Sequence, residues 1–82
     1  MSLRHYIKDK RDNVIVFYVK TEKENDGLYH SKVYNVIDRS YANTPYYDIQ
    51  WNNTIEILTS SNIFKGILNH NKLIRKWEGK AK

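Results

Sequence analysis

The most apolar stretch of the chain, residues 14–19, reads Val-Ile-Val-Phe-Tyr-Val and is β-branched or aromatic throughout. Because it is apolar at every position, we expect a central strand covered on both faces. Asn25, Asp26 and Gly27 then predict a hairpin turn, since an Asp-Gly pair supplies the positive φ that a type I′ turn requires. The return strand is expected over about residues 28–38.

Counting from either plausible turn centre assigns the apolar residues of this hairpin to two faces. On one face we expect Ile15, Phe17, Val19, Tyr34 and Val36. On the other face we expect Val14, Val16, Tyr18, Val33 and Ile37.

Residues 46–58 are predicted to form a second hairpin. Asn52-Asn53 is its turn signal, because Asn tolerates the left-handed conformation. The alternation of residues 54–58 is typical of its second strand.

The N-terminal segment allows two interpretations. Leu3, His5 and Ile7 alternate as in a strand, which is the favoured prediction. The same segment also fits a helical turn capped by Ser2, with Leu3, Tyr6 and Ile7 directed inward.

The C-terminal region predicts an amphipathic helix, for which Ser60 or Ser61 is the expected N-cap. Six apolar residues recur at helical spacing: Ile63, Phe64, Ile67, Leu68, Ile74 and Trp77. The helix should end near 77–79 with Gly79 as its cap. The aromatic core candidates are Phe17, Tyr34, Phe64 and Trp77.

Together these elements predict a single α+β domain over residues 1–82. It consists of a small antiparallel β-sheet of four to five strands, in two or three hairpins, with the C-terminal helix packed on one face. Residues 79–82 are expected to form a frayed basic tail.

Catalytic and metal-binding motifs do not emerge from the sequence. The chain has no cysteine, which excludes disulfides and thiol nucleophiles. Its three histidines are scattered without metal-ligand spacing, and His70 is expected to be a partly buried structural residue. We therefore expect no enzyme, no catalytic residue, no metal and no cofactor.

No apolar segment approaches the roughly 18–20 residues of a membrane span, and the N-terminus lacks the apolar core of a signal peptide. We therefore expect a cytoplasmic protein without a membrane partner. The abundance of Lys, Asn, Ile and Tyr is typical of AT-rich genomes, such as that of a low-GC bacterium or its phage.

The net charge of +5 comes entirely from residues 61–82, because eight basic and eight acidic side chains cancel in residues 1–60. This asymmetry suggests a local anionic partner. Helical spacing would allow cations of this region to contact successive phosphates of a nucleic acid. The candidates are Lys65, Lys72, Arg75, Lys76 and Lys80. A solvated basic helix face is the alternative interpretation.

Tyr46, Tyr47 and Trp51 lie close together in the sequence near an expected edge hairpin. They are candidates for stacking on unpaired bases. The leading hypothesis is therefore a small, non-enzymatic protein that binds RNA or single strands through its basic helix and exposed aromatics. The alternative is a small accessory or inhibitor protein, of the kind that phages encode, that docks on a host protein through such aromatics.

Overall fold

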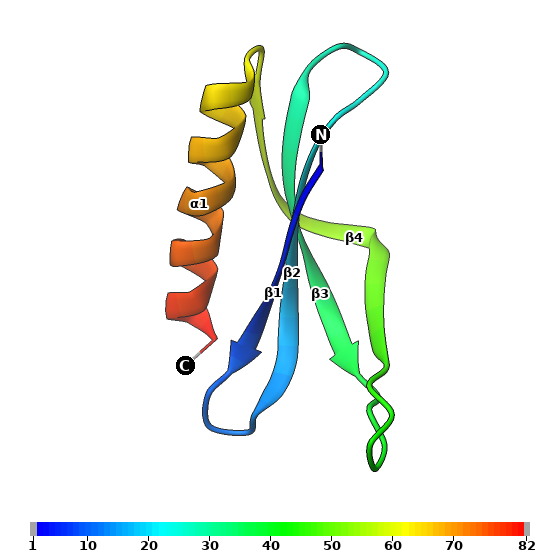
Figure 1. The fold of residues 1–82 in the computed structure, drawn as a ribbon. Coiled ribbons are helices and arrows are strands. Elements are labelled where there is room, and N and C mark those ends of the chain that lie inside the picture. The colour runs from blue at the N-terminus through cyan, green and yellow to red at the C-terminus, as the bar shows by residue number, and fades with distance from the viewer. Residues whose placement is uncertain (1, 82) are drawn as a thin grey trace.

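A computed structural model describes residues 2–81 of the chain. It contains β1 (Ser2–Asp9), β2 (Val14–Lys23), β3 (Tyr29–Asp38), β4 (Tyr47–Ser60) and α1 (Ile63–Lys80). The strands form one antiparallel sheet in the order β1-β2-β3-β4. Helix α1 runs along one face of this sheet, on the left in Figure 1. The predicted α+β fold is confirmed, and the N-terminal segment is a strand rather than a helical turn.

The main core lies between α1 and the sheet. Its most deeply buried residues come from β1, β2, β3 and α1, and are Ile7, Val19, Val33 and Leu73 respectively. Phe17 and Trp77 are partly buried against this core, with ring centroids 5.0 Å apart in an edge-to-face arrangement. The prediction for Phe64 is wrong, because its side chain is 76% exposed.

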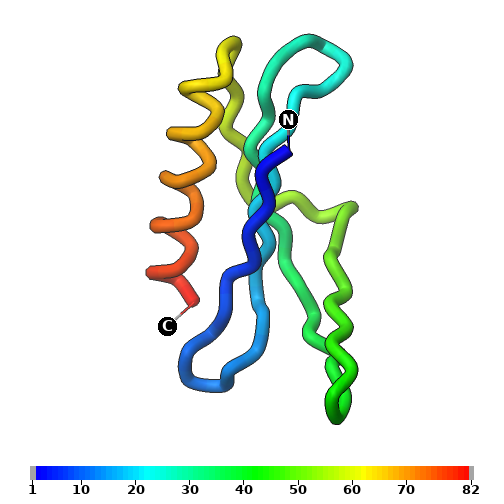
Figure 2. Tube along the Cα trace, viewed as in Figure 1, coloured from blue at the N-terminus to red at the C-terminus, as the bar shows by residue number. Residues whose placement is uncertain are grey.

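Strand β4 is continuous but sharply bent, so the predicted second hairpin is wrong. Residues 50–53 of β4, including the Asn52-Asn53 pair, stand opposite Asn35 alone between the pairs Tyr34–Thr54 and Val36–Ile49. These extra residues bend β4, so that its first half lies on the side remote from α1 (Figures 1 and 2) while it still pairs with β3, from Val36–Ile49 to Asp38–Tyr47.

The bend of β4 creates a second core on the face opposite α1. Ile49, from the first half of β4, packs against a cluster of buried residues: Ile15, Tyr18, Tyr34 and Val36. Strand β2 is therefore covered on both faces, as its uniformly apolar sequence predicts.

The predicted register between β2 and β3 is wrong by one residue. The connection is a five-residue loop between Lys23 and Tyr29 rather than a type I′ turn, and within it only Gly27 has positive φ. Val19 therefore pairs with Val33, and Tyr18 pairs with Tyr34. Because side chains alternate along a strand, this shift moves a whole set of residues to the other face.

A β-bulge in the pairing of β1 with β2 places Ile15 on the other face of the sheet from the one expected. Phe17 stands opposite Ile7, while Ile15 stands opposite Lys8, so β2 holds one extra residue between these pairs. Ile15 consequently packs in the second core with Tyr18 and not, as expected, beside Phe17.

Helix α1 begins one or two residues later than expected and ends later as well. Its N-cap is Asn62, whose side chain accepts a hydrogen bond from the Lys65 amide at 2.8 Å. Gly79 lies inside the helix and is not its cap. The segment expected to fray, residues 79–82, is helical as far as Lys80, and Lys82 lies outside the described residues.

Candidate nucleic-acid interface

The face of the sheet opposite α1, here called the open face, carries a row of aromatic residues. Antiparallel pairing places Tyr6 opposite Tyr18, and Tyr18 opposite Tyr34, across three strands. The bend of β4 adds Trp51, whose ring centroid lies 5.7 Å from that of Tyr18 and 5.0 Å from that of Tyr34. Tyr47 completes this aromatic cluster, with its ring 5.0 Å from that of Tyr6.

The aromatic cluster has a buried floor and an exposed surface. Tyr18 and Tyr34 are only 4% and 7% exposed and form the floor. Burial raises the pKa of the Tyr18 phenol, which therefore stays neutral under physiological conditions. Tyr6, Tyr47 and Trp51 are 41%, 36% and 53% exposed and present ring surfaces to solvent. The exposed rings are thus positioned by packing on other rings.

A row of three cations borders the aromatic row on the open face. Arg4 is paired with Lys20 across β1 and β2, and Lys20 with Lys32 across β2 and β3. The Lys20 ammonium lies 5.5 Å from the centroid of the Trp51 ring, within the range of a cation–π interaction.

Two carboxylates offset the repulsion within this cation row. Lys20 forms an ion pair with Glu22 at 3.2 Å, and Lys32 forms one with Glu24 at 2.8 Å. The hydrogen bond to Glu24 raises the pKa of Lys32. Arg4 has no ion pair with any residue of the described range 2–81; its Nε donates to the Ser2 hydroxyl at 3.4 Å. Arg4 is thus the cation of this row most available to an anionic ligand.

The structure brings together only part of the site expected from sequence. Tyr47 and Trp51 belong to the aromatic cluster, whereas Tyr46, 59% exposed, has no ring partner within residues 2–81. The cluster members that sequence reasoning missed are Tyr6, Tyr18 and Tyr34, together with the neighbouring cations Arg4, Lys20 and Lys32. To predict that these residues share one face, the registers of β1 with β2 and of β2 with β3 must be known.

The basic residues of α1 lie on the other side of the molecule. The helix covers the face of the sheet opposite the aromatic cluster (Figure 1). Lys76 is already engaged, because it forms an ion pair with Glu56 at 2.9 Å and lies 5.9 Å from the Trp77 ring centroid. Lys80 lies 5.3 Å from the same centroid. The helix cations and the aromatic cluster therefore do not form one continuous surface.

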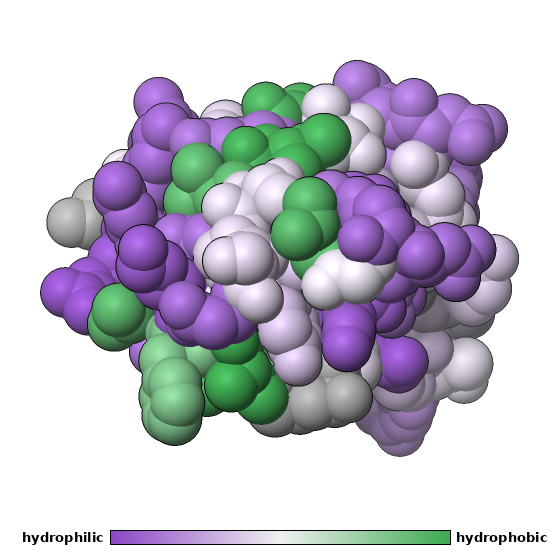
Figure 3. Space-filling view, turned by 90° about the horizontal axis from the view of Figure 1, so that it is seen from above, coloured by the Kyte–Doolittle hydropathy of each residue, from purple (hydrophilic) through white to green (hydrophobic). Residues whose placement is uncertain are grey.

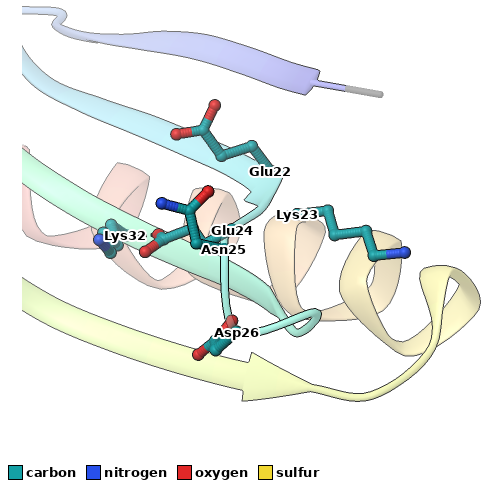
Figure 4. Close-up of a pocket in the computed structure, with 6 residues that line it drawn as sticks. All are labelled: Glu22, Lys23, Glu24, Asn25, Asp26 and Lys32. Carbon is teal, nitrogen blue, oxygen red and sulfur yellow. Dashed lines mark ion pairs between the residues drawn. The ribbon is translucent and has the colours of Figure 1, made fainter.

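A polar hollow beside the β2–β3 loop offers no evident chemistry. Figure 4 shows its six lining residues, among which Lys23 points away from the carboxylates. Glu24 is engaged by Lys32, and Asp26 accepts a 2.7 Å hydrogen bond from His30. The bond from the Leu28 amide and that from His30 lower the pKa of Asp26. No group of metal-ligating side chains suited to a metal ion occurs within residues 2–81.

His70 lies in the main core, in keeping with the structural role expected for it. Its side chain is 5% exposed, and its Nδ1 is 2.8 Å from the hydroxyl of Thr21. Thr21 in turn donates to the Ser31 hydroxyl at 2.7 Å. Burial lowers the pKa of His70, so the imidazole is held neutral in this network.

Comparison with protein-family models finds no match, and comparisons with curated proteins and with solved structures find none either. The function is therefore inferred from the geometry of the open face.

Proposed function

We propose that this protein binds single-stranded nucleic acid on its open face. The observation that supports this function is that exposed rings of the aromatic cluster, Tyr6 and Trp51, lie beside the row of cations. Unpaired bases stack on exposed Trp and Tyr rings, while neighbouring Lys and Arg contact the phosphates. In this arrangement Trp51, Tyr6 and Tyr47 receive bases, and Arg4 and Lys20 face the backbone.

Stacking supplies most of the affinity in this proposal. Each base stacked on an aromatic side chain contributes about 1–3 kcal/mol. The electrostatic contribution is smaller, because Lys20 and Lys32 are already paired with carboxylates. A single strand is favoured over a duplex, since only unpaired bases expose their faces to the rings.

The test is a titration of a fluorescein-labelled single-stranded RNA, followed by fluorescence anisotropy. Replacement of Trp51 by Ala should weaken binding by about 1–3 kcal/mol. The matched control is Tyr41→Ala, because Tyr41 is 84% exposed in the loop between β3 and β4, outside the aromatic cluster. Circular dichroism should show that both variants keep their fold. The same RNA annealed to its complement should bind more weakly than the single strand.

Equal losses from Trp51→Ala and Tyr41→Ala would contradict the assignment of the site. Absence of binding by the folded wild type would refute the proposed function. The exposed rings would then support the alternative, in which a small accessory or inhibitor protein uses them to dock on another protein.

A further inference from the structure

Two large apolar side chains project from the side of α1 that faces away from the sheet. Phe64 is 76% exposed and Leu68 is 67% exposed. They are four residues apart and therefore neighbours on the helix surface. At about 100° per residue, both lie about 160° around the axis from the buried Gly66. Figure 3, seen from the end where α1 begins, shows hydrophobic side chains in green reaching the surface between hydrophilic ones in purple.

Three cations share this outer face of α1, which we define by Phe64, Lys65, Leu68, Lys72 and Arg75. All three cations are exposed. None of them forms an ion pair with another residue of the described range. The single acid of the helix, Glu78, lies about 80° from Leu68 around the axis, at the margin of the face. The outer face thus combines exposed apolar groups with unpaired positive charge.

This combination discriminates among the possible occupants of the outer face. A nucleic-acid strand would find a stacking surface on Phe64 alone, because Leu68 has no aromatic ring and its 67% exposed side chain would stay in water. A second copy of the same face would oppose cation to cation. Protein interfaces are depleted in Lys. The three hollows beside Glu24, Asp38 and Asn52 are all lined by residues outside α1, so none of these hollows offers a peptide a groove along the helix.

We propose that the outer face of α1 binds an anionic lipid surface. Phe64 and Leu68 enter the boundary between headgroups and acyl chains, and Lys65, Lys72 and Arg75 contact lipid phosphates. A helix that lies on a bilayer needs no complementary pocket. Within residues 2–81 no helix has the length and apolarity to cross one. The sequence-based expectation of no membrane partner depended on the lack of a spanning segment, which surface binding does not need.

The test is co-sedimentation of the full chain with vesicles of phosphatidylcholine mixed with phosphatidylglycerol, compared with vesicles of phosphatidylcholine alone. The wild type should sediment with the anionic vesicles only. Combined Phe64→Ser and Leu68→Ser replacement should weaken binding by about tenfold or more, because the inserted apolar surface is lost. Combined Lys65→Gln, Lys72→Gln and Arg75→Gln replacement should weaken it by about a hundredfold, at about 1 kcal/mol for each charge.

Matched variants distinguish binding through the outer face of α1 from a general attraction of the basic protein to anionic vesicles. Lys8→Gln, Lys10→Gln and Lys23→Gln remove the same charge from exposed positions outside α1 and should have little effect. Trp51→Ala, on the open face, should not alter vesicle binding. Equal losses from the two triple variants would overturn the proposal, as would binding to neutral vesicles of equal strength. Absence of binding by the folded wild type to anionic vesicles would also overturn the proposal.

Discussion

Tyr6 and Tyr47 belong to the two edge strands of the sheet, β1 and β4, yet their ring centroids lie only 5.0 Å apart. Edge strands of a flat four-stranded sheet would be separated by two intervening strands, roughly 14 Å across. The contact therefore requires the first half of β4 to fold back over the open face. The bend at residues 50–53 allows β4 to fold back in this way, and the Tyr6–Tyr47 contact links the first half of β4 to β1.

The Tyr6–Tyr47 contact should contribute measurably to stability. In a double-mutant cycle with Tyr6→Ala and Tyr47→Ala, the coupling energy should be about 0.5–1.5 kcal/mol, as for other aromatic pairs. The measurement is urea unfolding followed by circular dichroism. Tyr46→Ala is the control, since Tyr46 is exposed and has no ring partner among residues 2–81, and it should not couple to Tyr6. A coupling energy near zero for Tyr6 and Tyr47 would contradict the closed arrangement.

Two glycines of α1 should respond differently to alanine. A Cβ on Gly79 would meet no atom within 4 Å, so Gly79→Ala should raise the free energy of unfolding by about 0.5–1 kcal/mol through helix propensity. A Cβ on Gly66 would lie 3.2 Å from the Tyr29 Cβ, which is tighter than ordinary contact. Gly66→Ala should therefore gain less or lose stability. Thermal unfolding distinguishes the two, and equal stabilisation would contradict the close packing of α1 on β3.

Stability should fall in mild acid because of His70. Burial, with a smaller contribution from His5, lowers the pKa of His70 in the folded state, whereas the unfolded value is about 6.5. Between these two pKa values the unfolded chain binds a proton that the folded chain does not. The free energy of unfolding should thus decrease as the pH falls from above about 6.5 to the folded pKa, then level off with respect to this group.

The pH dependence is measurable by urea unfolding at a series of pH values. His70→Gln should flatten the slope just below pH 6.5, whatever its effect on stability at neutral pH. His30→Gln, which removes an imidazole outside the main core, should leave the contribution of His70 in place. An unchanged slope in the His70→Gln variant would show that another group causes the acid sensitivity.

Salt dependence discriminates between the open face and the basic helix as the nucleic-acid site. If Arg4 and Lys20 each neutralise one phosphate of a single strand, log K should fall against log salt with a slope of about −1.4, and Arg4→Gln should reduce it by about 0.7. Combined Lys65→Gln, Lys72→Gln and Arg75→Gln replacement should leave the slope unchanged. A steeper slope that disappears in this helix variant would return the site to α1.

The fold class and the position of the main elements could be predicted from the sequence. The uniformly apolar run at 14–19 indicated a strand covered on both faces, and the periodicity after Ser61 indicated the C-terminal helix. These signals are local, because a strand or helix shows its burial through the spacing of its own apolar residues. The concentration of positive charge in residues 61–82 was equally evident, since it depends only on where charged residues occur along the chain.

Which residues share a surface could not be predicted from the sequence, because it depends on how the strands pair. The five-residue β2–β3 loop and the bulge between the pairs Ile7–Phe17 and Lys8–Ile15 set the register, and a shift of one residue exchanges the two faces of a strand. The aromatic row of Tyr6, Tyr18 and Tyr34 depends on that register, as does its contact with Trp51.

The side of α1 that faces the sheet likewise could not be predicted from the spacing of the helix's own apolar residues. The six apolar positions cover a wider arc of the helix than a sheet can contact. Close approach at Gly66, where Tyr29 lies beneath the helix, turns Leu73 and His70 inward. Phe64 and Leu68 are consequently left facing solvent. Helical periodicity selects an apolar side of a helix, whereas the contact with the sheet selects the part of that side that is buried.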